Sequence, residues 1–76
     1  MTKEQWKEIF AGNLIDILEE KGMTQAELAM DAELPKSQIS EYINGNSMPS
    51  LAAAITMSYA LDMELGDLVD FGERVK

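Results

Sequence analysis

Residues 24–50 constrain the fold of this chain more than any other segment. Two short helical stretches are expected there, at about residues 25–31 and 35–44, with only a tight turn between them. Thr24 and Glu27 have the spacing of a capping box, in which each side chain accepts a hydrogen bond from a backbone N–H at the helix start. Helices joined by so short a turn cross at a steep angle, so the segment has the layout of a helix-turn-helix.

Three further helices are expected around this pair. The first covers about residues 3–21, because Thr2 and Gln5 have capping-box spacing and Gly22 suits a left-handed cap at the helix end. Proline is favoured in the first turn of a helix, which supports a helix start at Pro35. The remaining two helices are expected at about residues 51–61, with Ser50 as N-cap, and at roughly 64–70.

Apolar residues recur every three or four positions along these stretches, as they do on one face of a helix. The chain shows neither a strand pattern nor a repeat, which predicts a single all-α domain of five helices over residues 1–76. Met57 is expected at the edge of the core, and Met30 and Met48 on the surface. The inward candidates are Trp6, Ile9, Phe10, Leu14, Ile17, Leu18, Leu28, Ala29, Ile39, Tyr42, Ile43, Leu51, Ala54, Ile55, Ser58, Leu61, Leu65 and Leu68.

The composition excludes several classes of function. The chain has neither cysteine nor histidine, so a disulfide framework or a zinc site is not expected, and no cofactor is predicted. General acid–base catalysis would lack its commonest residue, and neither a glycine-rich phosphate loop nor a nucleophile elbow is present, so an enzyme is not expected. The N-terminus does not resemble a signal peptide and no segment is apolar enough to span a bilayer, which favours the cytoplasm.

Short matches to a known family occur in order along the chain: Thr24-Gln25 with Glu27-Leu28-Ala29, Ile39-Ser40, Gly45 with Pro49-Ser50-Leu51, Ala60-Leu61, and Leu65-Gly66-Asp67-Leu68. By these residues the chain resembles the phage repressor and Cro-like family of helix-turn-helix domains, over about residues 13–69. The resemblance implies a five-helix, lambda-repressor-like fold and a sequence-specific DNA-binding regulator that binds a double-stranded operator as a homodimer. In such a protein the second helix of the motif enters the major groove.

The resemblance also implies roles for individual side chains. Gln25 is expected to bind a phosphate and to brace side chains of the recognition helix. The positions of Lys36, Ser37 and Glu41 reach base edges in the family, whereas Gln38 and Asn44 commonly contact the DNA backbone. Thr24 and Asn46 complete the predicted DNA-binding set, and Leu65, Val69 and Phe71 are predicted at the dimer interface.

The sequence departs from the family pattern at three places. Glu33 stands where the family often has glycine, and a residue with a side chain is strained there if φ is positive. The loop Asn46-Ser47-Met48 lacks the lysine or arginine that often binds phosphate. Leu18 and Ile43 stand where many members pair an arginine with a glutamate, a replacement that can be neutral for stability.

Net charge keeps a second function open. Fourteen acidic against six basic residues give a charge of −8, whereas nucleic-acid-binding domains are usually basic. The alternative is therefore a protein-interaction module on the same fold, such as an anti-repressor or a DNA mimic. The placement of Lys3, Lys7 and Lys21 relative to the recognition helix bears on this choice.

Two apolar residues near the end of the chain, Phe71 and Val75, have two possible places. They cover the end of the core or extend the dimer interface, and the sequence does not favour either.

Overall fold

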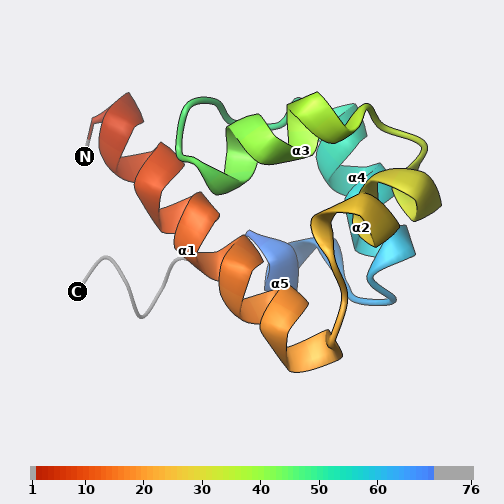
Figure 1. The fold of residues 1–76 in the computed structure, drawn as a ribbon. Coiled ribbons are helices and arrows are strands. Elements are labelled where there is room, and N and C mark those ends of the chain that lie inside the picture. Colours follow the sequence, from red (N-terminus) through yellow and green to blue (C-terminus); the bar gives the residue numbers. More distant parts are fainter. Residues whose placement is uncertain (1, 70–76) are drawn as a thin grey trace.

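The computed structural model describes residues 2–69, which form five helices and no strand (Figure 1). The predicted all-α fold is confirmed. No helix in this described range is both long and apolar enough to cross a membrane. The helices are α1 (Lys3–Lys21), α2 (Gln25–Ala32), α3 (Lys36–Ile43), α4 (Leu51–Ala60) and α5 (Leu65–Leu68).

Local hydrogen bonds set the helix starts that the sequence predicts. The Thr2 hydroxyl accepts from the Gln5 N–H at 3.2 Å, and the Gln5 side-chain oxygen accepts from the Thr2 N–H at 2.7 Å. Thr24 and Glu27 form the same reciprocal pair at 3.1 and 3.0 Å. Both capping boxes are therefore confirmed, and each satisfies backbone donors that a helix start leaves unpaired.

The predicted boundaries differ from the observed ones by one or two residues. Pro35 is the N-cap of α3 and lies before the first helical residue, Lys36. Its φ of −60° and ψ of 138° are extended, so the helix can begin only after it. The fifth helix is a single turn, Leu65–Leu68, and its predicted end at Asp70 lies outside the described residues.

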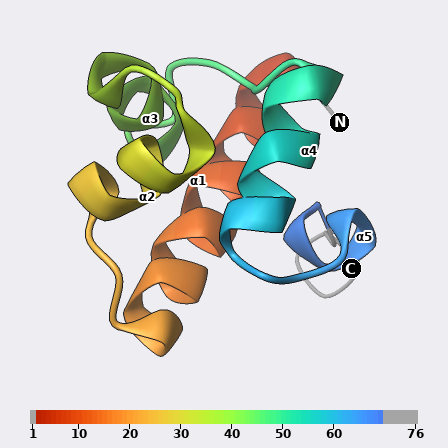
Figure 2. The ribbon, with the colours of Figure 1, turned by 90° about the vertical axis from the view of Figure 1, so that its right-hand side faces the viewer.

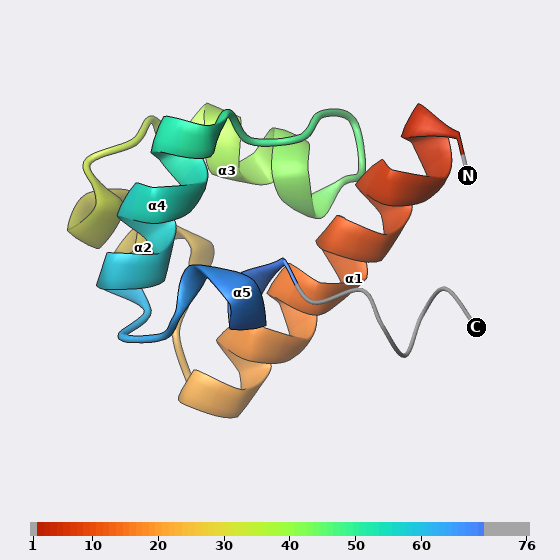
Figure 3. The same ribbon diagram turned by 180° about the vertical axis from the view of Figure 1, so that it is seen from behind.

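The helices enclose one core. α3 packs against both α1 and α2, α2 also packs against α4, and α5 packs against α4. Figure 2 shows α4 running past α2 and α3, and Figure 3 shows α5 at the front of that view, between α4 and α1. The Phe10 and Tyr42 rings meet edge to face, with centroids 6.2 Å apart, and join α1 to α3. The largest fully buried side chains are Phe10, Leu14, Leu28, Ile39, Met57, Leu61 and Leu68.

The predicted inward face of α4 is partly wrong. Leu51 is 68% exposed and Ile55 is 39% exposed, whereas Met57, predicted at the core edge, is completely buried. The sequence of α4 is apolar almost all round, so its periodicity does not select one face. Contact with α2 and α5 makes the choice, and it turns Met57 and Ser58 inward.

Met57→Ala should lower the free energy of unfolding by about 2–5 kcal/mol, because it leaves a cavity in the core. Met30→Ala is the matched control: it makes the same change on α2, where the side chain is 77% exposed. The control should change stability by no more than about 0.5 kcal/mol. Urea titration followed by circular dichroism measures both, and equal effects would contradict the assigned face of α4.

Candidate nucleic-acid interface

The turn between α2 and α3 depends on a left-handed residue at Glu33. Its φ is 56° and its ψ is 41°, so the positive φ that strains a residue with a side chain is present here. The Glu33 N–H donates to the Met30 carbonyl at 3.2 Å, and the Leu34 N–H donates to the Ala29 carbonyl at 3.0 Å. These bonds close the last turn of α2. A residue with a side chain in this region costs roughly 1–2 kcal/mol, which the packing of the two helices offsets.

The second helix of the motif, α3, buries one side and exposes the other. Ile39 and Tyr42 face the core and are almost fully buried. Lys36, Ser37 and Glu41 are exposed, as predicted for residues that face a groove. The helix therefore presents an ammonium group, a hydroxyl and a carboxylate, which together can donate to and accept from base edges.

Two side chains expected at this interface are held by partners within the protein. The Ser40 hydroxyl donates to the Gln25 side-chain oxygen at 3.1 Å, which ties the start of α2 to the middle of α3. This contact is the brace that the resemblance implied for Gln25. Gln38 donates from its side-chain nitrogen to the Tyr42 hydroxyl and is half-buried. This second bond joins residues four apart on one helix, a spacing that is visible in the sequence, although the sequence assigns Tyr42 only to the core.

The start of α2 and the loop after α3 border the exposed side of α3. At the start of α2, the Glu27 carboxylate accepts a hydrogen bond from the Thr24 N–H, so this backbone donor already has a partner within the protein. After α3, Gly45 adopts a φ of 75° and turns the chain. Asn44 and Asn46 are exposed there, and the Asn46 N–H donates to the Glu41 carbonyl at 2.9 Å. The loop is thus folded back on α3 and offers amide side chains rather than cations.

Leu18 and Ile43 line the same hollow, as the positions assigned to them by the resemblance implied. Leu18 is buried and Ile43 is half-buried against the same core. Both line a shallow hollow that also includes Gln25. Two apolar side chains therefore occupy the place where many members of the family have an ion pair, and they need no hydrogen-bond partner.

An exposed apolar stripe on α4 was missed as a surface. Leu51, Ile55 and Tyr59 are spaced four residues apart and are 68%, 39% and 82% exposed. The spacing of four residues is visible in the sequence. The sequence nevertheless predicts Leu51 and Ile55 in the core and gives no role to Tyr59. Of the predicted dimer residues, Leu65 is half-buried and Val69 is 37% exposed, while Phe71 lies outside the described residues.

The five-helix arrangement with a braced helix-turn-helix defines the class of this protein. Residues 14–68 match the helix-turn-helix family, so the chain belongs to that family, and it is of the phage repressor and Cro-like type. It is also similar to the restriction-modification controller protein C.AhdI from Aeromonas hydrophila, with a TM-score of 0.75 and 28% identity. That match covers 79% of this chain and 91% of the controller.

A search of curated proteins found no significant match. The family and the similar structure together indicate a DNA-binding regulator rather than an enzyme.

The Gln25–Ser40 bond should show as coupling in a double-mutant cycle. Gln25→Ala and Ser40→Ala should interact by about 0.5–1.5 kcal/mol in the free energy of unfolding. Thr56→Ala provides the comparison, since the Thr56 hydroxyl bonds within α4 to the Ala52 carbonyl at 2.9 Å. Gln25→Ala and Thr56→Ala should be additive. If the effects of Gln25→Ala and Ser40→Ala on the free energy of unfolding are additive, the hydrogen bond between these side chains contributes nothing to stability.

Proposed function

We propose that this chain is a sequence-specific transcriptional regulator that binds double-stranded DNA with α3 in the major groove. The observation that carries the proposal is the brace between Gln25 and Ser40, which holds α3 against α2 with its polar side outward. An α-helix with its side chains is about 10–12 Å in diameter, which suits a major groove about 12 Å wide.

The exposed groups suggest separate roles in such a complex. Lys36 and Ser37 can donate to acceptors on base edges, and Glu41 can accept from the amino group of cytosine. Thr24, Gln25, Asn44 and Asn46 border this surface and can bond to phosphate oxygens. Gln38 donates to the hydroxyl of the buried Tyr42, and its amide has a second N–H that can reach the DNA backbone. The similarity to a controller protein supports a regulatory role for this binding.

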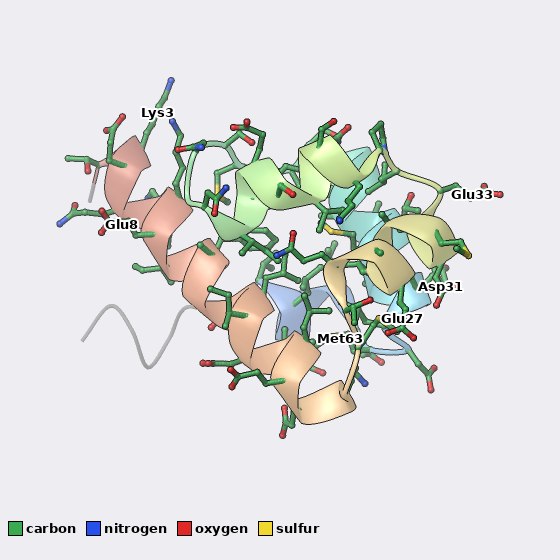
Figure 4. The ribbon with its side chains drawn as sticks, in the orientation of Figure 1. Lys3, Glu8, Glu27, Asp31, Glu33 and Met63 are labelled. Carbon is green, nitrogen blue, oxygen red and sulfur yellow. The ribbon has the colours of Figure 1, made fainter. Side chains whose placement is uncertain are left out.

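The acidic composition shapes how binding would work. Figure 4 shows Glu27, Asp31 and Glu33 around α2, away from the end of the molecule where Lys3 lies. With few cations, few counterions are released, so non-specific affinity should be low and the salt dependence shallow. Discrimination between DNA sequences then depends on the contacts that α3 makes with the bases. The same acidic side of α2 would favour a protein partner if DNA binding fails.

We further propose that two copies associate through the α4 stripe, Leu51, Ile55 and Tyr59, together with Val69. These are four of the large apolar side chains exposed within residues 2–69. Ile55 and Tyr59 also line one hollow with Leu65, so the stripe is continuous with α5, where the dimer interface was predicted. A symmetric dimer would present two α3 helices to half-sites roughly 34 Å apart.

Replacement of the base-reading residues tests the first proposal. Lys36→Ala combined with Ser37→Ala should abolish preference for DNA selected by the wild-type chain from a random duplex library, because the direct base contacts are lost. Lys21→Ala, at the far end of α1, should keep the preference. Fluorescence anisotropy at two salt concentrations measures the affinities. If the wild-type chain selects no duplex, but captures a protein whose binding depends on the acidic surface, the alternative function of a protein-interaction module would be favoured.

A charge on the α4 stripe tests the dimer. Tyr59→Asp should raise the dimer dissociation constant at least about tenfold, since aromatic side chains at an interface often contribute more than 1.4 kcal/mol. Met30→Asp adds the same charge to an exposed position on α2 and should leave the constant unchanged. Sedimentation equilibrium measures both variants. A monomeric wild-type chain, or a dimer indifferent to Tyr59→Asp, would contradict this interface.

A further inference from the structure

The interface described above is short of positive charge at one end. Lys36 is the single lysine or arginine between residues 22 and 73 of the sequence. It begins α3, whereas the loop that follows α3, residues 44–50, contains no cation. Phosphate contacts normally draw on lysine and arginine, so the end of α3 next to this loop lacks the usual source of affinity.

The first turns of α1 lie outside the part of the chain that matches the family. The family match begins at residue 14, but α1 begins at Lys3, so residues 3–13 are helical and precede it. This segment carries Lys3 and Lys7, which are four residues apart and therefore on the same side of the helix. Lys3 is exposed and Lys7 is half-buried.

Packing holds this segment against the end of α3 that lacks charge. A β-carbon placed on Gly45, in the loop after α3, would lie 4.0 Å from the Lys7 carbonyl oxygen. One turn further along α1, the Phe10 ring contacts the Tyr42 ring near the end of α3. Both contacts fix the start of α1 beside the loop, so the position of the two lysines relative to α3 is set by the core.

Side-chain directions agree with this placement. Figure 4 shows Lys3 projecting on the side of α1 where α3 and its loop lie, whereas Glu8 projects on the opposite side. Lys21 is in the last turn of α1, at the other end of the helix. Three of the four lysines within residues 2–69 are thus at the two ends of α3: Lys36 at its start, and Lys3 and Lys7 at its end.

We propose that Lys3 and Lys7 bind phosphates of the DNA backbone beside the α3–α4 loop, in place of the cations that the loop lacks. The proposal rests on the proposed function, because it adds contacts to the same complex. A lysine acts on phosphate as a flexible point charge, so an exposed ammonium at this edge needs no pocket. These contacts add affinity and orient the protein, but they carry no sequence information.

The test compares the full chain with charge variants on one helix. The probe is a duplex selected by the wild-type chain from a random library, with a scrambled duplex of the same length beside it. Lys3→Gln and Lys7→Gln are measured singly and together, and Lys21→Gln is the control that matches each single variant in charge and helix. Lys3→Arg with Lys7→Arg restores both charges. Affinities are measured from 50 to 200 mM salt, and circular dichroism verifies that each variant is folded.

The double glutamine variant should reduce the slope of log affinity against log salt by about 1.8, which is 0.9 for each of two phosphates. Its affinity loss between 50 and 200 mM salt should then be about twelvefold smaller than that of the wild type. In the double glutamine variant, the ratio of the affinities for the selected and the scrambled duplex should stay unchanged. Lys21→Gln should keep the wild-type slope, and the double arginine variant should show that slope too.

Two other results would separately overturn the role of the two lysines and the proposed function. A double glutamine variant with the wild-type slope would overturn the role of Lys3 and Lys7 and leave the proposed function standing. A wild-type chain that selects no duplex would overturn the proposed function, and the lysine contacts with it.

Discussion

The close crossing of α2 and α3 is the constraint on which the rest of the structure depends. Ala29 and Ala32 are small and buried where the two helices meet, beside Ile39 of α3. Only a left-handed residue can turn the chain so sharply, and Glu33 takes that conformation although it has a side chain. The contacts of the two helices with α1 and α4 offset this strain, because they bury both helices against one core.

The same crossing places the polar groups of the interface. When Ile39 and Tyr42 turn inward, Lys36, Ser37 and Glu41 must face outward. Ser40 then reaches Gln25 of α2, and Gln38 reaches Tyr42 one turn further along α3, so one bond to a neighbouring helix and one bond within α3 hold side chains beside the exposed side. Shape and hydrogen bonding thus favour a groove-reading helix, while the net charge of −8 reduces general attraction to phosphate. In the proposed complex, few cations at the ends of α3 supply that attraction.

Much of this arrangement was predictable because it depends on local chemistry. Thr2, Thr24 and Ser50 accept hydrogen bonds from backbone groups three residues on, so three helix starts follow from spacing alone. Gly22 and Asn44-Gly45 end helices for an equally local reason, the ease of the left-handed conformation at glycine. The inward side of α3 was also predictable, since its apolar and polar residues alternate with helical period.

The inward side of α4 was not predictable in the same way. Leu51 and Ile55 are as apolar as Met57, and small alanines separate them, so no amphipathic pattern distinguishes core from surface. Neighbouring helices made the selection, and the exposed stripe that includes Tyr59 became visible only in three dimensions. The placement of Lys3 and Lys7 has the same origin, because no short-range rule relates the first turns of α1 to a loop some forty residues away.

The sequence by itself therefore determined the five helices, most of their caps and the polar side of α3, because each depends on residues within one or two helical turns. The tertiary structure decided which side of α4 is buried, which side chain Gln25 contacts, and which end of α3 the lysines of α1 approach. Those outcomes require packing between segments distant in the chain, and packing selects among faces that hydrophobic pattern leaves equivalent.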